Sequence, residues 1–233
     1  MYLVIGSNKV FGIIQNRLIE DFNLTPSEII NPQVYNFKLN YLSINQLDKL
    51  FCDYKSILVS SLNIIDIVKQ HIINSSNKVD YFVMGKSSYI ELQQYTKNKI
   101  YYPINQTGYL ALFNEILVSK LYATKINRSN LLILSSNNSL QDGMISLFTE
   151  YFYDVRFLDL YIMEYNFEII DQYIDKVSHI VINSSSMIKP FFNYLQTKSF
   201  NYSNRLKFIT YHLKIKNILE LDYKINHLIY FDH

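Results

Sequence analysis

Ser56-Ile-Leu-Val-Ser-Ser-Leu-Asn63 runs directly into Ile64-Ile-Asp-Ile-Val-Lys-Gln-His-Ile72, and this succession of apolar strand, serine-rich corner and helix decides the fold. A second copy lies about half the chain later, from Ser178-His-Ile-Val-Ile-Asn-Ser-Ser-Ser186 to Met187-Ile-Lys-Pro-Phe-Phe-Asn-Tyr-Leu195. Each copy is followed by another short apolar strand, which ends at Gly85 in the first and at Tyr211 in the second. The duplication predicts two similar α/β halves with a cleft between them.

Short apolar runs alternate with longer helical patterns along the chain. The expected strands are 2–5, 56–59, 81–84, 100–102, 131–134, 154–158, 179–182, 207–210 and 228–231. The expected helices are 10–22, 64–73, 88–95, 108–122, 140–151, 167–177 and 187–196, with Asn63, Thr107 and Ser186 as candidate N-caps. Such alternation is typical of parallel sheets covered by helices on both faces.

The domain organisation follows from this pattern. We expect two Rossmann-like, doubly wound domains: residues 1–35 with 163–233, built from both chain ends, and an inserted domain of residues 36–162. A two-strand linker should join them, crossing near residues 26–32 and returning near 161–167. Ligands of such sheets bind outside the carboxyl ends of the strands, where both serine corners stand.

Composition excludes several classes of function. The net charge of +2, with 18% charged residues and no run of Lys and Arg, argues against a nucleic-acid partner. Cys52 is the only cysteine, which excludes an internal disulfide and fits a reducing compartment. The first residues lack the basic region of a signal peptide, and no apolar run reaches the roughly 18 residues of a membrane helix. We therefore expect a cytoplasmic protein without a membrane partner, and a monomer.

Glycine and histidine usage excludes common cofactor sites. The chain has 5 glycines, which form neither a G-x-G-x-x-G nor a Walker loop, so a dinucleotide or nucleoside triphosphate is not expected. The 5 histidines show no metal-ligand spacing, and no Gly-x-Ser-x-Gly elbow surrounds any serine. The sequence therefore predicts neither a metal nor another cofactor.

Four short motifs follow one another in the middle of the chain. They are Ser60-Ser-Leu-Asn-Ile-Ile65, Met84-Gly-Lys-Ser-Ser88, then Leu132-Ile-Leu134 with Val155-Arg-Phe-Leu-Asp-Leu-Tyr161, and finally Asn183-Ser-Ser-Ser-Met-Ile188. Their order and spacing, from about residue 55 to residue 195, resemble those of the uroporphyrinogen-III synthase family.

The resemblance implies a lyase that works without a cofactor in haem biosynthesis. The family's substrate is hydroxymethylbilane, a linear tetrapyrrole with eight carboxylates, which hydroxymethylbilane synthase could hand over. Loss of water and closure through a spiro intermediate give uroporphyrinogen III, in which the last pyrrole ring is inverted. Holding the chain folded would supply most of the acceleration.

The resemblance also implies site residues. Tyr161 matches the family's signature tyrosine and would hydrogen-bond to or protonate the departing hydroxyl; the alternative is an aromatic side chain that only packs. The implied substrate-binding residues lie at strand ends and are Ser60, Ser61, Gly85, Ser88, Ser184, Ser186 and Thr210. Helix N-termini favour carboxylates, but serine is also preferred there as a cap without any ligand.

The chain departs from the family pattern at three places. The first strand ends Ile5-Gly6-Ser7 without the usual arginine, and Ser135-Ser136 replaces Arg-Gly after the third motif. Tyr211-His-Leu-Lys214 stands where the second half would repeat Gly-x-x-Thr. The alternative function is therefore a two-domain protein that binds an anionic small molecule without catalysis.

Overall fold

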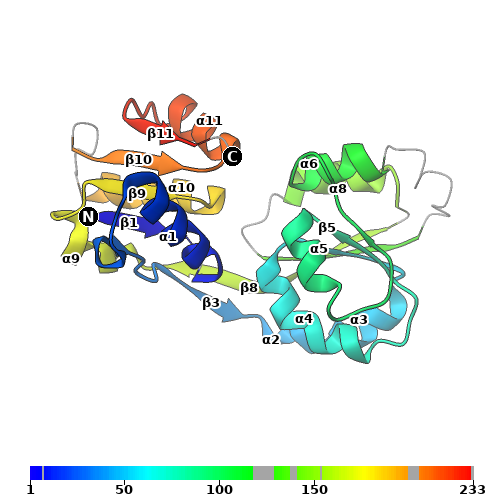
Figure 1. Cartoon of the computed structure of the whole chain (residues 1–233). Coiled ribbons are helices and arrows are strands. Elements are labelled where there is room, and N and C mark those ends of the chain that lie inside the picture. The colour runs from blue at the N-terminus through cyan, green and yellow to red at the C-terminus, as the bar shows by residue number, and fades with distance from the viewer. Residues whose placement is uncertain (7, 118–128, 137–140, 153, 199–204, 232–233) are drawn as a thin grey trace. The chain divides into compact units, whose positions relative to one another are not determined.

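The computed structural model describes the chain except for residues 7, 118–128, 137–140, 153, 199–204 and 232–233 (Figure 1). The chain divides into two compact units. Unit 1 comprises Met1–Asn36 and Glu164–His233, and unit 2 comprises Phe37–Met163. Each unit contains its own sheet with helices packed on it, so the expected fold class of two α/β units is confirmed.

The sheet of unit 2 has the strand order β3-β8-β7-β4-β5-β6. Its strands are β3 (Tyr35–Leu39), β4 (Ser56–Val59), β5 (Asp80–Val83), β6 (Ile100–Tyr101), β7 (Leu131–Ser136) and β8 (Val155–Tyr165). Strands β4 to β8 pair in parallel, with Ile57 opposite both Tyr81 and Leu132. Their apolar side chains point alternately to the two faces, which is why continuous apolar runs form these strands.

Helices cover both faces of this sheet. The face with Ile57 and Val59 packs against α3 (Leu47–Asp53), α4 (Leu62–Asn74) and α5 (Lys86–Leu92). The face with Leu58 packs against α6 (Tyr109–Leu112), the π-helix η2 (Phe113–Leu117) and α8 (Gln141–Thr149). Figure 1 shows the two helical layers on opposite sides of the strands. Unit 2 is therefore doubly wound.

The sheet of unit 1 has the strand order β11-β10-β9-β1-β2, and its strands pair in parallel. They are β1 (Tyr2–Ile5), β2 (Ile29–Ile30), β9 (His179–Ile182), β10 (Lys207–Thr210) and β11 (Leu228–Tyr230). Ile14 and Leu18 of α1 (Asn8–Phe22) pack on the face that carries Val4 and Val181. Helix α10 (Ser185–Thr197) covers the other face, where the Phe192 ring stacks on Phe208 with centroids 5.5 Å apart.

The chain passes between the units inside strands β3 and β8. The Asn40 N–H donates to the Leu160 carbonyl at 2.9 Å and the Asn166 N–H to that of Val34 at 2.8 Å, so β3 runs antiparallel to β8. The segment 26–32, which we expected to be the crossing, belongs to unit 1. It forms the 3-10 helix η1 (Pro26–Glu28) and β2, because β1 offers Ile29 and Ile30 a strand to pair with.

Several elements differ from the sequence prediction. Strands β2 and β3 and three helices were not expected: α2 (Tyr41–Ile44), α3 and α11 (Leu213–Leu221). Strand β8 continues to Tyr165, beyond the expected end at residue 158, because β3 pairs with its second half. The helix expected over 108–122 is α6 followed by η2, and residues 118–122 lie outside the described residues. The 167–177 helix is a 3-10 turn, η3 (Phe167–Ile170), and the short α9 (Asp171–Ile174).

Candidate functional site

Each sheet has one point where the strand order reverses. In unit 2 the chain proceeds outward from β4 to β5 and β6, and from β7 to β8 in the other direction, so the reversal lies between β4 and β7. In unit 1 it lies between β1 and β9. Open α/β sheets bind ligands outside the strand ends at such points. Ser60 and Ser61 follow β4 and Ser184 follows β9, so each expected serine corner lies at a reversal point.

The corner of unit 2 begins helix α4. Ser61, and not the expected Asn63, is its N-cap, with an extended backbone at φ −157° and ψ 162°. The Ile64 N–H donates to the Ser61 carbonyl at 3.2 Å, and the Ser61 hydroxyl oxygen is buried without a hydrogen-bond partner among the described residues. The Ser60 N–H donates to the Leu134 carbonyl at 3.2 Å. The Ser60 N–H is therefore already paired within the sheet, and Ser60 can offer a ligand only its hydroxyl as a donor.

The corner of unit 1 has the same form. Ser184, and not the expected Ser186, is the N-cap of α10, with φ −134° and ψ 119°. The hydroxyls of Ser184 and Ser186 lie 2.8 Å apart and share a hydrogen bond. The Tyr165 hydroxyl donates to the Ser186 carbonyl at 3.2 Å. The Ser184 side chain makes no capping hydrogen bond to the helix. Its hydroxyl is oriented by the hydroxyl of Ser186 instead.

Gly85 and Ser88 lie one strand away from the reversal point of unit 2. Gly85 follows β5 and is the N-cap of α5, and Ser88 is buried within that helix. A Cβ at Gly85 would lie 3.0 Å from Cγ2 of Thr107, so this glycine lets the loop before α6 approach. In the same loop, the Gly108 N–H donates to the Met84 carbonyl at 2.8 Å. Gly108, and not the expected Thr107, is the N-cap of α6.

Thr210 lies at the end of β10 and is fully buried. Its hydroxyl accepts from the His212 N–H at 3.3 Å, and its carbonyl from the Phe231 N–H at 3.4 Å. The next residue, Tyr211, donates its hydroxyl to the Asp21 carboxylate at 2.9 Å. Burial and, second, this hydrogen bond raise the pKa of Tyr211 above its usual value. Both side chains thus hold the end of β10 in place.

Tyr161 lies in β8 and is 3% exposed. Its ring packs edge-on against Phe37 of β3, with centroids 4.8 Å apart and an interplanar angle of 76°, and it belongs to the core of unit 2. The structure thus brings Ser60, Ser61 and Tyr161 into unit 2 and Ser184 and Ser186 into unit 1.

One pair of residues at the reversal point of unit 2 was missed. Ser135, at the end of β7, is fully buried and donates its hydroxyl to Oδ1 of Asp159 in β8 at 2.6 Å. The sequence does carry a signal for Ser135, because a serine pair follows the apolar run of β7 as one follows that of β4. Asp159 gives no such signal, since it stands in the middle of a strand of mixed polarity.

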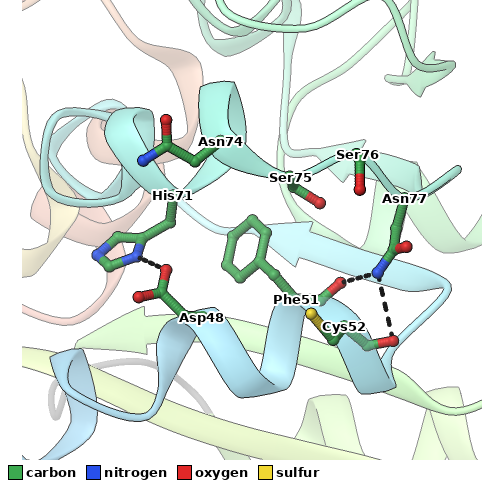
Figure 2. A pocket seen from close by; sticks show the side chains of 8 residues that line it. All are labelled: Asp48, Phe51, Cys52, His71, Asn74, Ser75, Ser76 and Asn77. Carbon is green, nitrogen blue, oxygen red and sulfur yellow. Dashed lines mark hydrogen bonds and ion pairs between the residues drawn. The ribbon is translucent and has the colours of Figure 1, made fainter.

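A separate pocket of about 270 Å³ lies at the other end of helix α4 (Figure 2). It is lined by Asp48, Phe51, Cys52, His71, Asn74, Ser75, Ser76 and Asn77. His71 Nδ1 and Asp48 Oδ1 lie 2.6 Å apart, and Asn77 Nδ2 donates to the carbonyls of Phe51 and Cys52 at 3.2 and 3.4 Å. Because α4 rises roughly 18 Å from Leu62 to Asn74, this pocket is remote from the Ser61 corner.

Among the residues that the structure describes, no three acidic, histidine or cysteine side chains gather as they would around a metal ion. Within the same residues, no helix is long and apolar enough to span a bilayer.

No protein-family model and no curated protein sequence matches the chain. Among solved structures, the chain is similar to the crystal structure of uroporphyrinogen III synthase from the extremely thermophilic bacterium Thermus thermophilus. The two share 10% sequence identity with a TM-score of 0.49, over 99% of this chain and 91% of the other. A similarity at this identity and TM-score assigns no activity to this chain.

Proposed function

We propose that this protein is a uroporphyrinogen-III synthase, which closes hydroxymethylbilane to uroporphyrinogen III with loss of water and inversion of the last ring. The observation that carries the proposal is the pair of serine corners, Ser60–Ser61 and Ser184–Ser186, each at the reversal point of a parallel sheet. Two helix N-termini with adjacent hydroxyls suit a substrate that bears several carboxylates. The reaction in this proposal is that of the synthase family, which the four sequence motifs resemble.

In this proposal the protein chiefly holds the linear tetrapyrrole in a folded conformation. The corner of each unit would hold carboxylates, and Gly85, Ser88 and Thr210 would support neighbouring strand ends. Tyr161 would give its phenolic proton to the departing hydroxyl as the C–O bond breaks, and electrons from the pyrrole nitrogen would form the exocyclic double bond. Positioning accounts for most of the acceleration, and the acid adds to it.

An assay of the product isomers tests the proposal. Freshly prepared hydroxymethylbilane closes by itself to the type I isomer, so we expect type III product only with the protein present. Tyr161→Phe should lower kcat by about ten- to a hundredfold while the KM changes little, because one positioned acid is lost. Type I product alone would favour the alternative, a binding protein for anionic small molecules. If Tyr161→Phe forms type III product at the wild-type rate, Tyr161 is a packing residue.

A further inference from the structure

The reversal point of unit 2 carries a fixed carboxylate beside the serine corner. Ser135 is fully buried, so its hydroxyl has no access to solvent and donates to Oδ1 of Asp159 at 2.6 Å. Hydrogen bonds to an ionised acceptor are short and strong, and this one determines the direction of the carboxylate. Asp159 itself is only partly buried, so a ligand at this edge of the sheet can reach it.

The backbone around Asp159 is held from two sides. Ser135 pairs with Asp159 but Ser136 pairs with Tyr161, so Leu160 is an extra residue and β8 has a bulge here. On the other side, Asn40 donates its side-chain Nδ2 to the Asp159 carbonyl at 3.1 Å and its N–H to the Leu160 carbonyl at 2.9 Å. Bulges of this kind redirect side chains beside functional sites.

The neighbours of Asp159 define what it can bind. The Ser60 N–H on the Leu134 carbonyl joins the ends of β4 and β7, so the serine corner and the Ser135–Asp159 pair share one edge of the sheet. The corner provides donors for carboxylates, whereas an ionised carboxylate only accepts hydrogen bonds and repels other carboxylates. The part of a ligand that reaches Asp159 must therefore carry hydrogen-bond donors, and in hydroxymethylbilane the pyrrole N–H groups are such donors.

We propose that Asp159, oriented by Ser135, accepts hydrogen bonds from pyrrole N–H groups of the substrate and so fixes which way the pyrrole rings face. This inference rests on the proposed function for the identity of the substrate. Asp159 is thus a binding residue, and Ser135 a positioning residue that acts through it.

Asp159→Asn tests the inference with little disturbance of the fold. The amide oxygen can still accept from Ser135, but the amide nitrogen then replaces the second carboxylate oxygen and presents a donor to the ligand. With hydroxymethylbilane we expect the KM to rise about tenfold, as for the loss of one charge-assisted hydrogen bond, and the share of type I product to increase. Ser135→Ala should also raise the KM and the share of type I product, but by less. Asp159→Glu, which keeps the carboxylate, should have a lower KM than Asp159→Asn. Thermal unfolding of each variant checks the fold.

A binding measurement separates this inference from the proposed function. Pyrrole-2-carboxylate and furan-2-carboxylate have the same shape, and only the first has a ring N–H. Titrated by NMR, wild type should prefer the pyrrole severalfold, and Asp159→Asn should abolish that preference. Absence of type III product from wild type would overturn the proposed function alone. Equal binding of the two probes to wild type, or no binding of either, would overturn the role of Asp159, as would an unchanged KM and isomer ratio in Asp159→Asn.

Discussion

At the scale of the residue, Tyr81 shows how burial can cost stability. Its side chain is fully buried in β5, and its hydroxyl has no hydrogen-bond partner in the part of the chain that the structure describes. Burial raises the pKa of this phenol, so the group is neutral but still desolvated. We expect Tyr81→Phe to raise the free energy of unfolding by about 1 kcal/mol, because a buried unsatisfied hydroxyl is removed without changing the ring. Urea unfolding measures this.

Tyr95→Phe is the matched control, because the Tyr95 hydroxyl does have a partner and donates to the Glu91 carboxylate at 2.9 Å. That variant should be no more stable than wild type. A loss of stability in Tyr81→Phe would show that its hydroxyl holds a bound water.

At the scale of the element, Glu115 of η2 secures the loop between β6 and α6. Its carboxylate accepts from the backbone N–H groups of Ile104 and Asn105 at 2.8 and 3.2 Å. These bonds hold the pKa of Glu115 below its usual value. A lowered carboxyl pKa stabilises the folded state above the unfolded pKa, and that contribution is lost as the pH falls through the folded pKa.

Glu115→Gln should therefore be less stable than wild type at pH 7, and the difference should shrink as the pH falls below about 4.5. Urea unfolding at several pH values measures it. Glu150→Gln, at an exposed residue just after α8, provides the control with the same change of charge. A difference that stays constant between about pH 7 and pH 3 would contradict the role of the Glu115 carboxylate.

At the scale of the whole molecule, the two units differ in how they use the chain. Unit 2 is one continuous segment, Phe37–Met163, with an apolar core on each face of its sheet. Unit 1 needs both ends of the chain, because β1 lies between β2 and β9 and pairs Leu3 with Ile180. We expect the fragment 37–163 to fold alone with a single cooperative urea transition, and the fragment 164–233 to remain unfolded.

Circular dichroism and NMR dispersion of the two fragments test this expectation, with the full-length protein as the reference. In the fragment 164–233 the edge of β9 that β1 covers would be open, and the face that α1 covers would be exposed. A folded 164–233 would show that β1 and α1 are dispensable for unit 1. An unfolded 37–163 would show that unit 2 depends on the chain ends.

The sequence by itself determined the buried strands and the fold class. Strands β1, β4, β9 and β10 begin and end at the expected residues, because each is built around a short apolar run. It also located the serine corners, since a serine pair between an apolar strand and a helical pattern marks a strand end. Helix caps were placed less well, and Ser61 and Ser184 begin their helices earlier than expected.

Only the tertiary structure decided the features that depend on a neighbouring strand. Tyr35, Phe37 and Leu39 of β3 alternate with polar residues, but Phe37 is exposed, so the alternation does not mark a fully buried face. The strand is fixed by its pairing with β8. Asp159 pairs with Ser135 next to the β-bulge, where the register between β7 and β8 shifts by one residue. Tyr161 is buried against Phe37 of β3. A strand's own residues encode its burial but not the identity or register of its partner, so the carboxylate at the reversal point could not be read from the sequence.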